Sequence, residues 1–245
     1  MAGLRTFSIE WRRARAGAGQ MYVIAIASQK GGAGKSTFAV NLATLADRER
    51  APALLIDTDT QGSLSVWHRA RGLRTPLLVS APASELEEVL ETARQHKTIE
   101  WVFIDGAAQA NEAVVAIMQA ATLVLIPTRP GVFDLASLPA TVGVARRIRK
   151  PFFVALNAVP PKRGITESPI VLAARKAVKD MGAPVWRGAI AQRAVYAHAL
   201  ASGQAVTEFE TSGPASDEIR LLWRDVSEAA RAMAQHQAAH QTKVG

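Results

Sequence analysis

A glycine-rich segment between two apolar segments constrains the fold of this chain more than any other feature. Residues 22–27 read Tyr-Val-Ile-Ala-Ile-Ala, a continuous apolar run typical of a strand that is covered on both faces. Residues 30–36 read Lys-Gly-Gly-Ala-Gly-Lys-Ser, and an Ala/Leu-rich helix is predicted from about residue 35 to 48. Glycines let the backbone approach a ligand closely, and the first N–H groups of a helix favour an anion. The segment therefore predicts a loop that binds phosphate.

The spacing of this loop matches a known phosphate-binding pattern. Residues 29–36 fit G-x-x-x-x-G-K-[ST], except that Gln29 replaces the first glycine. In this pattern the lysine, here Lys35, bridges the β- and γ-phosphates of a nucleotide, and the hydroxyl, here that of Ser36, ligates Mg²⁺. The sequence thus predicts a nucleotide and Mg²⁺ as ligands.

The rest of the chain alternates between predicted strands and predicted helices. Strands separated by helical segments of 10–15 residues indicate a doubly wound, mostly parallel sheet flanked by helices, an α/β fold. We expect one domain over residues 21–235, a flexible basic tail over 1–20 and a second tail over 236–245. Ser84 is predicted to cap a helix, with Glu87 as its capping-box partner. The remaining strands are predicted at 53–57, 77–79, 101–105, 122–126, 152–156 and 185–190, and the remaining helices at 135–148, 170–179, 193–201 and 216–234.

Composition excludes several classes of protein. The 245 residues include no cysteine, so disulfides, iron–sulfur clusters, thiolate zinc sites and cysteine nucleophiles are excluded. The longest apolar stretch, residues 113–127, is interrupted by Gln119 and Thr122 and is shorter than the ~20 residues of a membrane span. The first twenty residues contain no apolar segment of the kind found in secretory signals. We therefore expect a cytoplasmic protein.

Positive charge is concentrated in one part of the chain. The net charge is +8, and residues 129–193 contain twelve lysines and arginines but only three acidic residues. An excess of this kind favours a polyanionic partner.

Carboxylates follow two of the predicted strands. Asp57 and Asp59 follow one strand and Asp105 follows another, at the sheet edge where ligands bind in doubly wound folds. One carboxylate there can position an attacking water while another supports a metal ion. The alternative is turn chemistry, in which an Asp side chain accepts hydrogen bonds from nearby backbone N–H groups.

The segment Lys-Gly-Gly-x-Gly-Lys-Ser resembles the deviant Walker A motif of the ParA/MinD superfamily of P-loop ATPases. In that family the first lysine, here Lys30, reaches the nucleotide of the partner subunit in an ATP-sandwich homodimer. Residues 54–62 resemble the family's D-x-D-P-Q-G segment, with Thr60 in place of proline. Residues 103–106 resemble Walker B, although Ala107 and Ala108 depart from the family's Thr-Pro-Pro. Residues 126–134 resemble the segment that leaves the next strand.

This resemblance implies a role for each matching residue. Lys30, Lys35 and Asp59 would be catalytic, with Asp59 orienting the attacking water. Ser36, Asp57 and Asp105 would form the Mg²⁺ site, with Asp105 acting through a water. The remaining matches would bind ATP, with Asn157 at the adenine ring and the backbone of the loop at the phosphates, namely Gly31, Gly32, Ala33, Gly34, Lys35, Ser36 and Thr37.

The C-terminal third narrows the resemblance to one branch. Residues 188–196 and 201–206 resemble the small ParA proteins of the ParF kind, which lack an N-terminal helix-turn-helix domain. The absence of cysteine argues against the cluster carriers and the arsenite pump of the superfamily. Residues 229–240 are too small and too polar for the membrane-anchoring helix of MinD-like proteins. We therefore expect no membrane association.

The resemblance implies an ATP-driven switch that acts on DNA. The ATP-bound dimer would combine two basic surfaces, bind DNA non-specifically and associate with the nucleoid. A ParB-like or adaptor protein would stimulate hydrolysis, and the cargo would be a plasmid, a chromosome or a protein assembly. The alternative for the basic residues is a solvated helix face with compensation of a helix dipole. The predicted DNA contacts are Arg146, Arg147, Arg149, Lys150, Arg175, Lys176, Lys179, Arg220 and Arg224.

A second function remains open. Biosynthetic ATP-dependent enzymes of the same fold, such as dethiobiotin and cobyrinic acid amide synthases, phosphorylate a carboxylate. Binding to DNA that depends on ATP would separate the two functions, since only the switch requires it.

Overall fold

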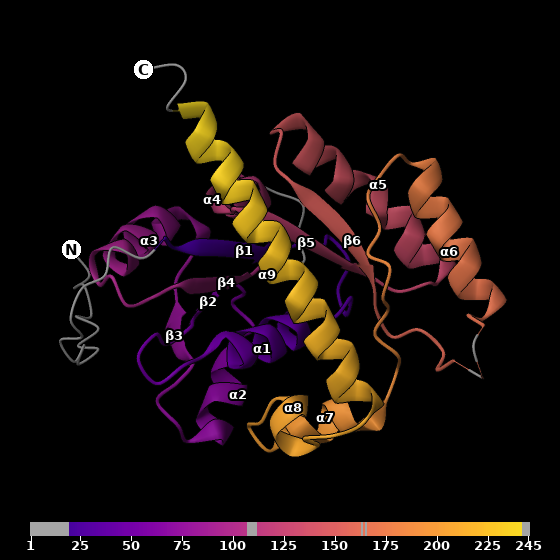
Figure 1. Cartoon of the computed structure of the whole chain (residues 1–245), viewed down its shortest axis with the longest axis horizontal. Coiled ribbons are helices and arrows are strands. Elements are labelled where there is room, and N and C mark those ends of the chain that lie inside the picture. The colour runs from indigo at the N-terminus through magenta and orange to yellow at the C-terminus, as the bar shows by residue number, and fades with distance from the viewer. Residues whose placement is uncertain (1–19, 107–111, 163, 165, 242–245) are drawn as a thin grey trace.

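A six-stranded parallel sheet forms the centre of the molecule (Figure 1). The computed structural model describes residues 20–106, 112–162, 164 and 166–241. The strand order is β3-β2-β4-β1-β5-β6, and every pair of neighbouring strands is parallel. The strands are β1 (Tyr22–Ile26), β2 (Leu54–Asp57), β3 (Leu77–Ser80), β4 (Trp101–Asp105), β5 (Leu123–Thr128) and β6 (Phe152–Leu156). The structure confirms the predicted α/β fold.

Both faces of the sheet are buried because apolar side chains alternate between them. Ile24 and Ile26 pack in one core layer, while Val23 and Ala25 pack in the other. Successive side chains of a strand point to opposite faces, so a continuous apolar run supplies both layers at once. This is the reason for the apolar sequence of residues 22–27.

Helices cover each face. The layer that contains Ile24 is covered by α1 (Lys35–Ala46), α2 (Ser63–Arg71), α7 (Ala194–Ala201), α8 (Val206–Phe209) and α9 (Pro214–Gln241). The other layer is covered by α3 (Leu86–Gln95), α4 (Glu112–Ala120), α5 (Val132–Arg147) and α6 (Pro169–Asp180). A short 3₁₀ helix, η1 (Ala83–Glu85), precedes α3. The long helix α9 crosses the sheet diagonally and packs on α1, β1 and β5 (Figure 1).

The predicted strand at residues 185–190 is wrong. The segment contacts β6 only through an isolated bridge between Val154 and Val185 and through single backbone hydrogen bonds, so the sheet ends at β6. The physical reason is Arg175 on α6. Its guanidinium donates hydrogen bonds to the carbonyl oxygens of residues 186, 187 and 188, which are groups that a strand would use in a ladder.

The start of one helix also differs from the prediction. Ser84 lies inside η1, and α3 begins at Leu86 with no side-chain hydrogen bond at its cap, so the capping box predicted for Ser84 is wrong. The helices α2, α4 and α8 were not predicted from the sequence, and α9 extends seven residues beyond the predicted end at residue 234.

Some predictions lie outside the described residues. These concern the tail at residues 1–19, the Ala107–Ala108 departure and the end of the C-terminal tail at 242–245. Within the part of the chain that the structure describes, no helix is long and apolar enough to cross a membrane.

Candidate nucleotide-binding site

The loop after β1 has a backbone that requires glycine at two positions. Gly32 and Gly34 have φ angles of 72° and 101°, in the left-handed region that glycine adopts without steric cost. A Cβ atom on Gly34 would lie 2.1 Å from Nδ2 of Asn157. Gly34 also caps α1, and its carbonyl accepts the first helical hydrogen bond from the N–H of Phe38. The loop therefore delivers the positive end of α1 to the ligand site.

Asn157 fixes this loop from the neighbouring part of the sheet. It follows β6, and its backbone N–H donates to the carbonyl of Thr128 at the end of β5. Its side-chain Nδ2 donates to the carbonyl oxygen of Ala33 over 2.8 Å. Asn157 is buried and lines the cavity described below. Its hydrogen bond to the loop was not predicted from the sequence, and its contact with adenine stays a prediction.

Two carboxylates lie side by side at the carboxyl edge of the sheet. Asp57 on β2 is in register with Asp105 on β4, and both are buried. Burial raises the pKa of Asp105 to about 7, and a hydrogen bond with Ser36 opposes that rise. Burial also raises the pKa of Asp57. It lowers the pKa of Lys35, while the negative charges of Asp105 and Asp59 oppose this shift. The site therefore holds acidic groups whose ionisation depends on what binds beside them.

The donor set fits Mg²⁺ held mainly by phosphate and water. Oδ1 of Asp105 is buried and has no hydrogen-bond partner, so it can accept from a metal-bound water without losing another contact. Within the described residues there is no cluster of three or more acidic, histidine or cysteine side chains that could form a complete metal cage. Mg²⁺ typically keeps several waters and uses one or two carboxylates together with substrate phosphates. Ser36 and Asp105 would hold the ion in that manner, where it would neutralise charge on the phosphates.

Asp57 and Asp59 also stabilise the turn between β2 and α2. The Asp57 carboxylate accepts hydrogen bonds from the backbone N–H groups of Asp59 and Leu64. Oδ1 of Asp59 accepts from the N–H of Gln61. Asp59 nevertheless lines the cavity, so turn chemistry and a site role are compatible for this residue.

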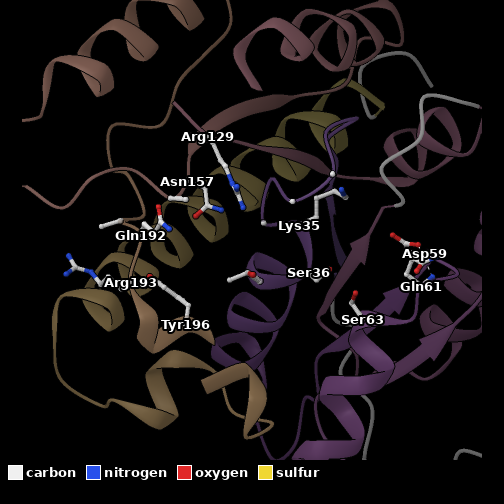
Figure 2. Close-up of a pocket in the computed structure, with 16 residues that line it drawn as sticks. Lys35, Ser36, Asp59, Gln61, Ser63, Arg129, Asn157, Gln192, Arg193 and Tyr196 are labelled. Carbon is white, nitrogen blue, oxygen red and sulfur yellow. Dashed lines mark hydrogen bonds between the residues drawn. The ribbon is translucent and has the colours of Figure 1, made fainter. Parts of the chain in front are cut away.

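A cavity of about 480 Å³ lies in front of the loop (Figure 2). Six residues of the predicted loop line it, as do Asp59 and Asn157, whereas Lys30 and Ala33 do not. Further polar residues for which no site role was predicted also line the cavity, namely Gln61, Ser63, Arg129, Gln192, Arg193 and Tyr196. Gln61 and Ser63 lie close in sequence to Asp57 and Asp59. Gln192, Arg193 and Tyr196 lie in residues 188–196, and Arg129 lies in residues 126–134. Both segments resemble segments of the family, and this resemblance was the available signal.

The predicted DNA-binding residues fall into two groups, and none of them lines this cavity. One group is at the carboxyl ends of α5 and α6, and the other is on α9. The helix α5 starts beside the carboxyl end of β5 and runs back for 16 residues, or about 24 Å. Its last turn therefore lies at the edge of the sheet opposite the nucleotide cavity.

Several of these basic side chains contact other parts of the chain. Arg175 forms a partly buried pair with Glu167 over 2.7 Å. Lys150 donates to the carbonyl of Ala121. Lys176 pairs with Asp180. The others with such contacts are Arg146, Arg220 and Arg224.

The fold and the site define a class of protein. A parallel sheet, a glycine-rich loop that opens a helix and buried acids on the neighbouring strands form a P-loop nucleotide-binding protein. Residues 24–206 match the family described as the CobQ/CobB/MinD/ParA nucleotide binding domain, and the chain belongs to this family. It is an ATPase that uses ATP and Mg²⁺.

Individual relatives agree with this assignment. The chain is 34% identical over 216 residues to "Maintenance of carboxysome distribution protein A" of Gloeobacter kilaueensis, which covers 84% of this chain and 92% of that protein. It is 35% identical over 124 residues to Protein ParA of Rhizobium radiobacter, covering 50% and 53% of the two chains. Its fold matches the solved ATP complex of Cyanothece McdA with a TM-score of 0.68 at 19% identity, covering 86% and 96% of the two chains.

Proposed function

We propose that this chain is a ParA-type switch that positions an intracellular cargo by ATP-dependent binding to DNA. The observation that carries the proposal is the near full-length similarity to a carboxysome distribution protein together with a second lysine, Lys30, in the phosphate loop. Lys30 does not line the cavity of its own subunit. This fits a role at the nucleotide of a second copy in a sandwich dimer.

The proposed cargo is inferred from the relatives and not from the geometry of the nucleotide site. One relative is named for carboxysome distribution, and another is a ParA protein. We propose a protein assembly as the cargo, with a plasmid or chromosome as the second candidate. A separate ParB-like or adaptor protein would stimulate hydrolysis and release the dimer from DNA.

The exposed basic residues at the ends of α5 and α6 are the proposed DNA contacts. Arg147, Arg149 and Lys179 are exposed, and no carboxylate of the described residues forms an ion pair with them. We expect Arg175 to stabilise the loop at 186–188 instead, because its guanidinium donates hydrogen bonds to the carbonyl oxygens of that loop and to Glu167. Since this patch lies opposite the nucleotide edge, a dimer would carry two separate patches, which raises affinity for one DNA molecule by multivalency.

The test is DNA binding by the purified chain with no nucleotide, with ADP and with a slowly hydrolysed ATP analogue, each with Mg²⁺ and at several salt concentrations. We expect tight binding only with the ATP analogue. A plot of log affinity against log salt concentration should be about twice as steep for the ATP-bound dimer as for the monomer, because each neutralised phosphate adds about 0.9 to the slope. Binding that ignores nucleotide would refute the switch. Absent binding would favour a biosynthetic ATPase.

Substitutions test the proposed DNA-binding surface and the proposed dimer interface separately. Arg147→Glu combined with Lys179→Glu should abolish DNA binding while ATP-dependent dimerisation, measured by light scattering, persists. Arg74→Glu is the matched control, because Arg74 is exposed and precedes β3, the outer strand on the side of the sheet away from β6. Lys30→Gln should bind ATP as a monomer without forming a dimer. A dimer of that variant with wild-type stability would remove Lys30 from the interface.

A further inference from the structure

Arg129 lies over the phosphate loop although it is far from that loop in the sequence. It follows β5 directly, where the carbonyl of Thr128 accepts a hydrogen bond from the N–H of Asn157, and the next residue, Pro130, is buried. A Cβ atom on Gly32 would lie 3.6 Å from Nη2 of Arg129. The guanidinium therefore lies close to the loop, and Figure 2 shows it directed toward the loop beside Asn157.

The guanidinium of Arg129 is unpaired in this position. Among the described residues, none forms a hydrogen bond or an ion pair with this exposed guanidinium, whereas the partly buried arginines are paired. Arg71 contacts Glu208 over 2.7 Å, and Arg193 contacts Glu218 over 2.8 Å.

Its surroundings are already positive, because the N-terminus of α1 and the side chain of Lys35 line the same cavity. These positive groups repel one another, and Asp59, the one carboxylate among the lining residues, lies on the other side of Lys35 (Figure 2). An anion between Arg129 and Lys35 would therefore stabilise the arrangement.

The position of Arg129 indicates which part of the nucleotide it contacts. Arg129 and Asn157 lie between Lys35 and Gln192, while Asp59 lies on the other side of Lys35 (Figure 2). The side with Asp59 is where the γ-phosphate and Mg²⁺ are expected. The side with Asn157 is where the base is expected. Arg129 would therefore be nearest to the α-phosphate of a bound nucleotide.

We propose that Arg129 is a nucleotide-binding residue that holds the α-phosphate end of the polyphosphate chain in ATP and ADP alike. A planar guanidinium can donate two parallel hydrogen bonds to a phosphate group. The proposal rests on the nucleotide site of the proposed function and requires neither DNA binding nor a dimer.

A contact with the α-phosphate has a specific kinetic consequence. The α-phosphate is present before and after hydrolysis, so the contact strengthens ground-state and transition-state binding equally. Its loss raises KM and leaves kcat unchanged. A lysine provides the charge without the paired donors, so Arg129→Lys should recover part of the affinity.

The test is titration of fluorescent ADP and of a fluorescent, slowly hydrolysed ATP analogue into the wild type, Arg129→Ala, Arg129→Lys and the control Arg74→Ala. Arg74 is also exposed but lies before β3, at the opposite edge of the sheet. We expect about a tenfold weaker affinity of Arg129→Ala for both nucleotides, as estimated for a charged hydrogen bond that is partly exposed to solvent. Thermal stability without nucleotide should match that of the wild type.

Each result decides the proposal. Equal losses for ADP and the ATP analogue, partial recovery in Arg129→Lys and no change in Arg74→Ala support it. Unchanged affinity in Arg129→Ala overturns it, and so does a loss confined to the ATP analogue, which would assign the contact to the γ-phosphate. Because ADP binding is measured on the chain without DNA, failure of the DNA-binding proposal leaves this result interpretable.

Discussion

Replacing Asp105 with asparagine tests whether burial controls the ionisation of this carboxyl. The pKa of Asp105 is about 7 in the folded chain, against about 3.9 for an unfolded Asp. The folded state therefore binds more protons than the unfolded state between these values, and stability contributed by this group is lost as pH rises toward 7. Asp105→Asn removes the titrating group and should remove this pH dependence.

The size of the effect follows from the difference in pKa. Three pKa units correspond to about 4 kcal/mol at high pH, of which about 1.5 kcal/mol is already lost at pH 5. The stability of Asp105→Asn relative to the wild type should therefore improve by about 3 kcal/mol between pH 5 and pH 8. For a domain of this size, that is a relative change in Tm of about 6–12 °C.

The measurement is thermal unfolding of both proteins without nucleotide at half-unit steps from pH 5 to pH 8. Titrating groups that do not interact with Asp105 cancel in the comparison, and any constant cost of the new amide changes the offset but not the slope. Asp180→Asn is the matched control, because Asp180 is exposed and, among the residues that the structure describes, pairs with Lys176 alone. A difference between wild type and Asp105→Asn that does not vary with pH would refute the reasoning.

Other predictions concern individual residues. Gly34→Ala should weaken nucleotide binding by at least tenfold in a titration, because its φ is 101° and its Cβ would meet Asn157; Gly143→Ala, whose Cβ meets nothing within 4 Å, is the control. Gly203→Ala should destabilise the fold by about 3 kcal/mol or more in denaturant unfolding, because its φ is 70° and its Cβ would lie 2.1 Å from the backbone N of Arg71. Asp59→Ala should bind the ATP analogue with near wild-type affinity but hydrolyse ATP at least tenfold more slowly; hydrolysis at the wild-type rate would remove Asp59 from the mechanism.

Much of the fold could be predicted because its signals are local. The apolar runs of residues 22–26 and 101–105 specify strands buried on both faces, and the glycines after the first run specify the loop. Local sequence signals could not show that residues 185–190 do not form a strand. Their apolar side chains suit a strand, but the guanidinium of Arg175, from a separate helix, takes their carbonyl groups.

The phosphate loop, the acids at the strand ends and the class of fold could be predicted from the sequence, since each depends on neighbours within a few residues or on a repeating pattern. Only the tertiary structure placed Arg129 over Gly32 and Asn157 against Ala33. These contacts join residues about 100 positions apart, and they form because parallel strands bring all their carboxyl ends to one edge of the sheet. Burial at that edge, which sets the pKa of Asp105, likewise depends on every layer packed around it.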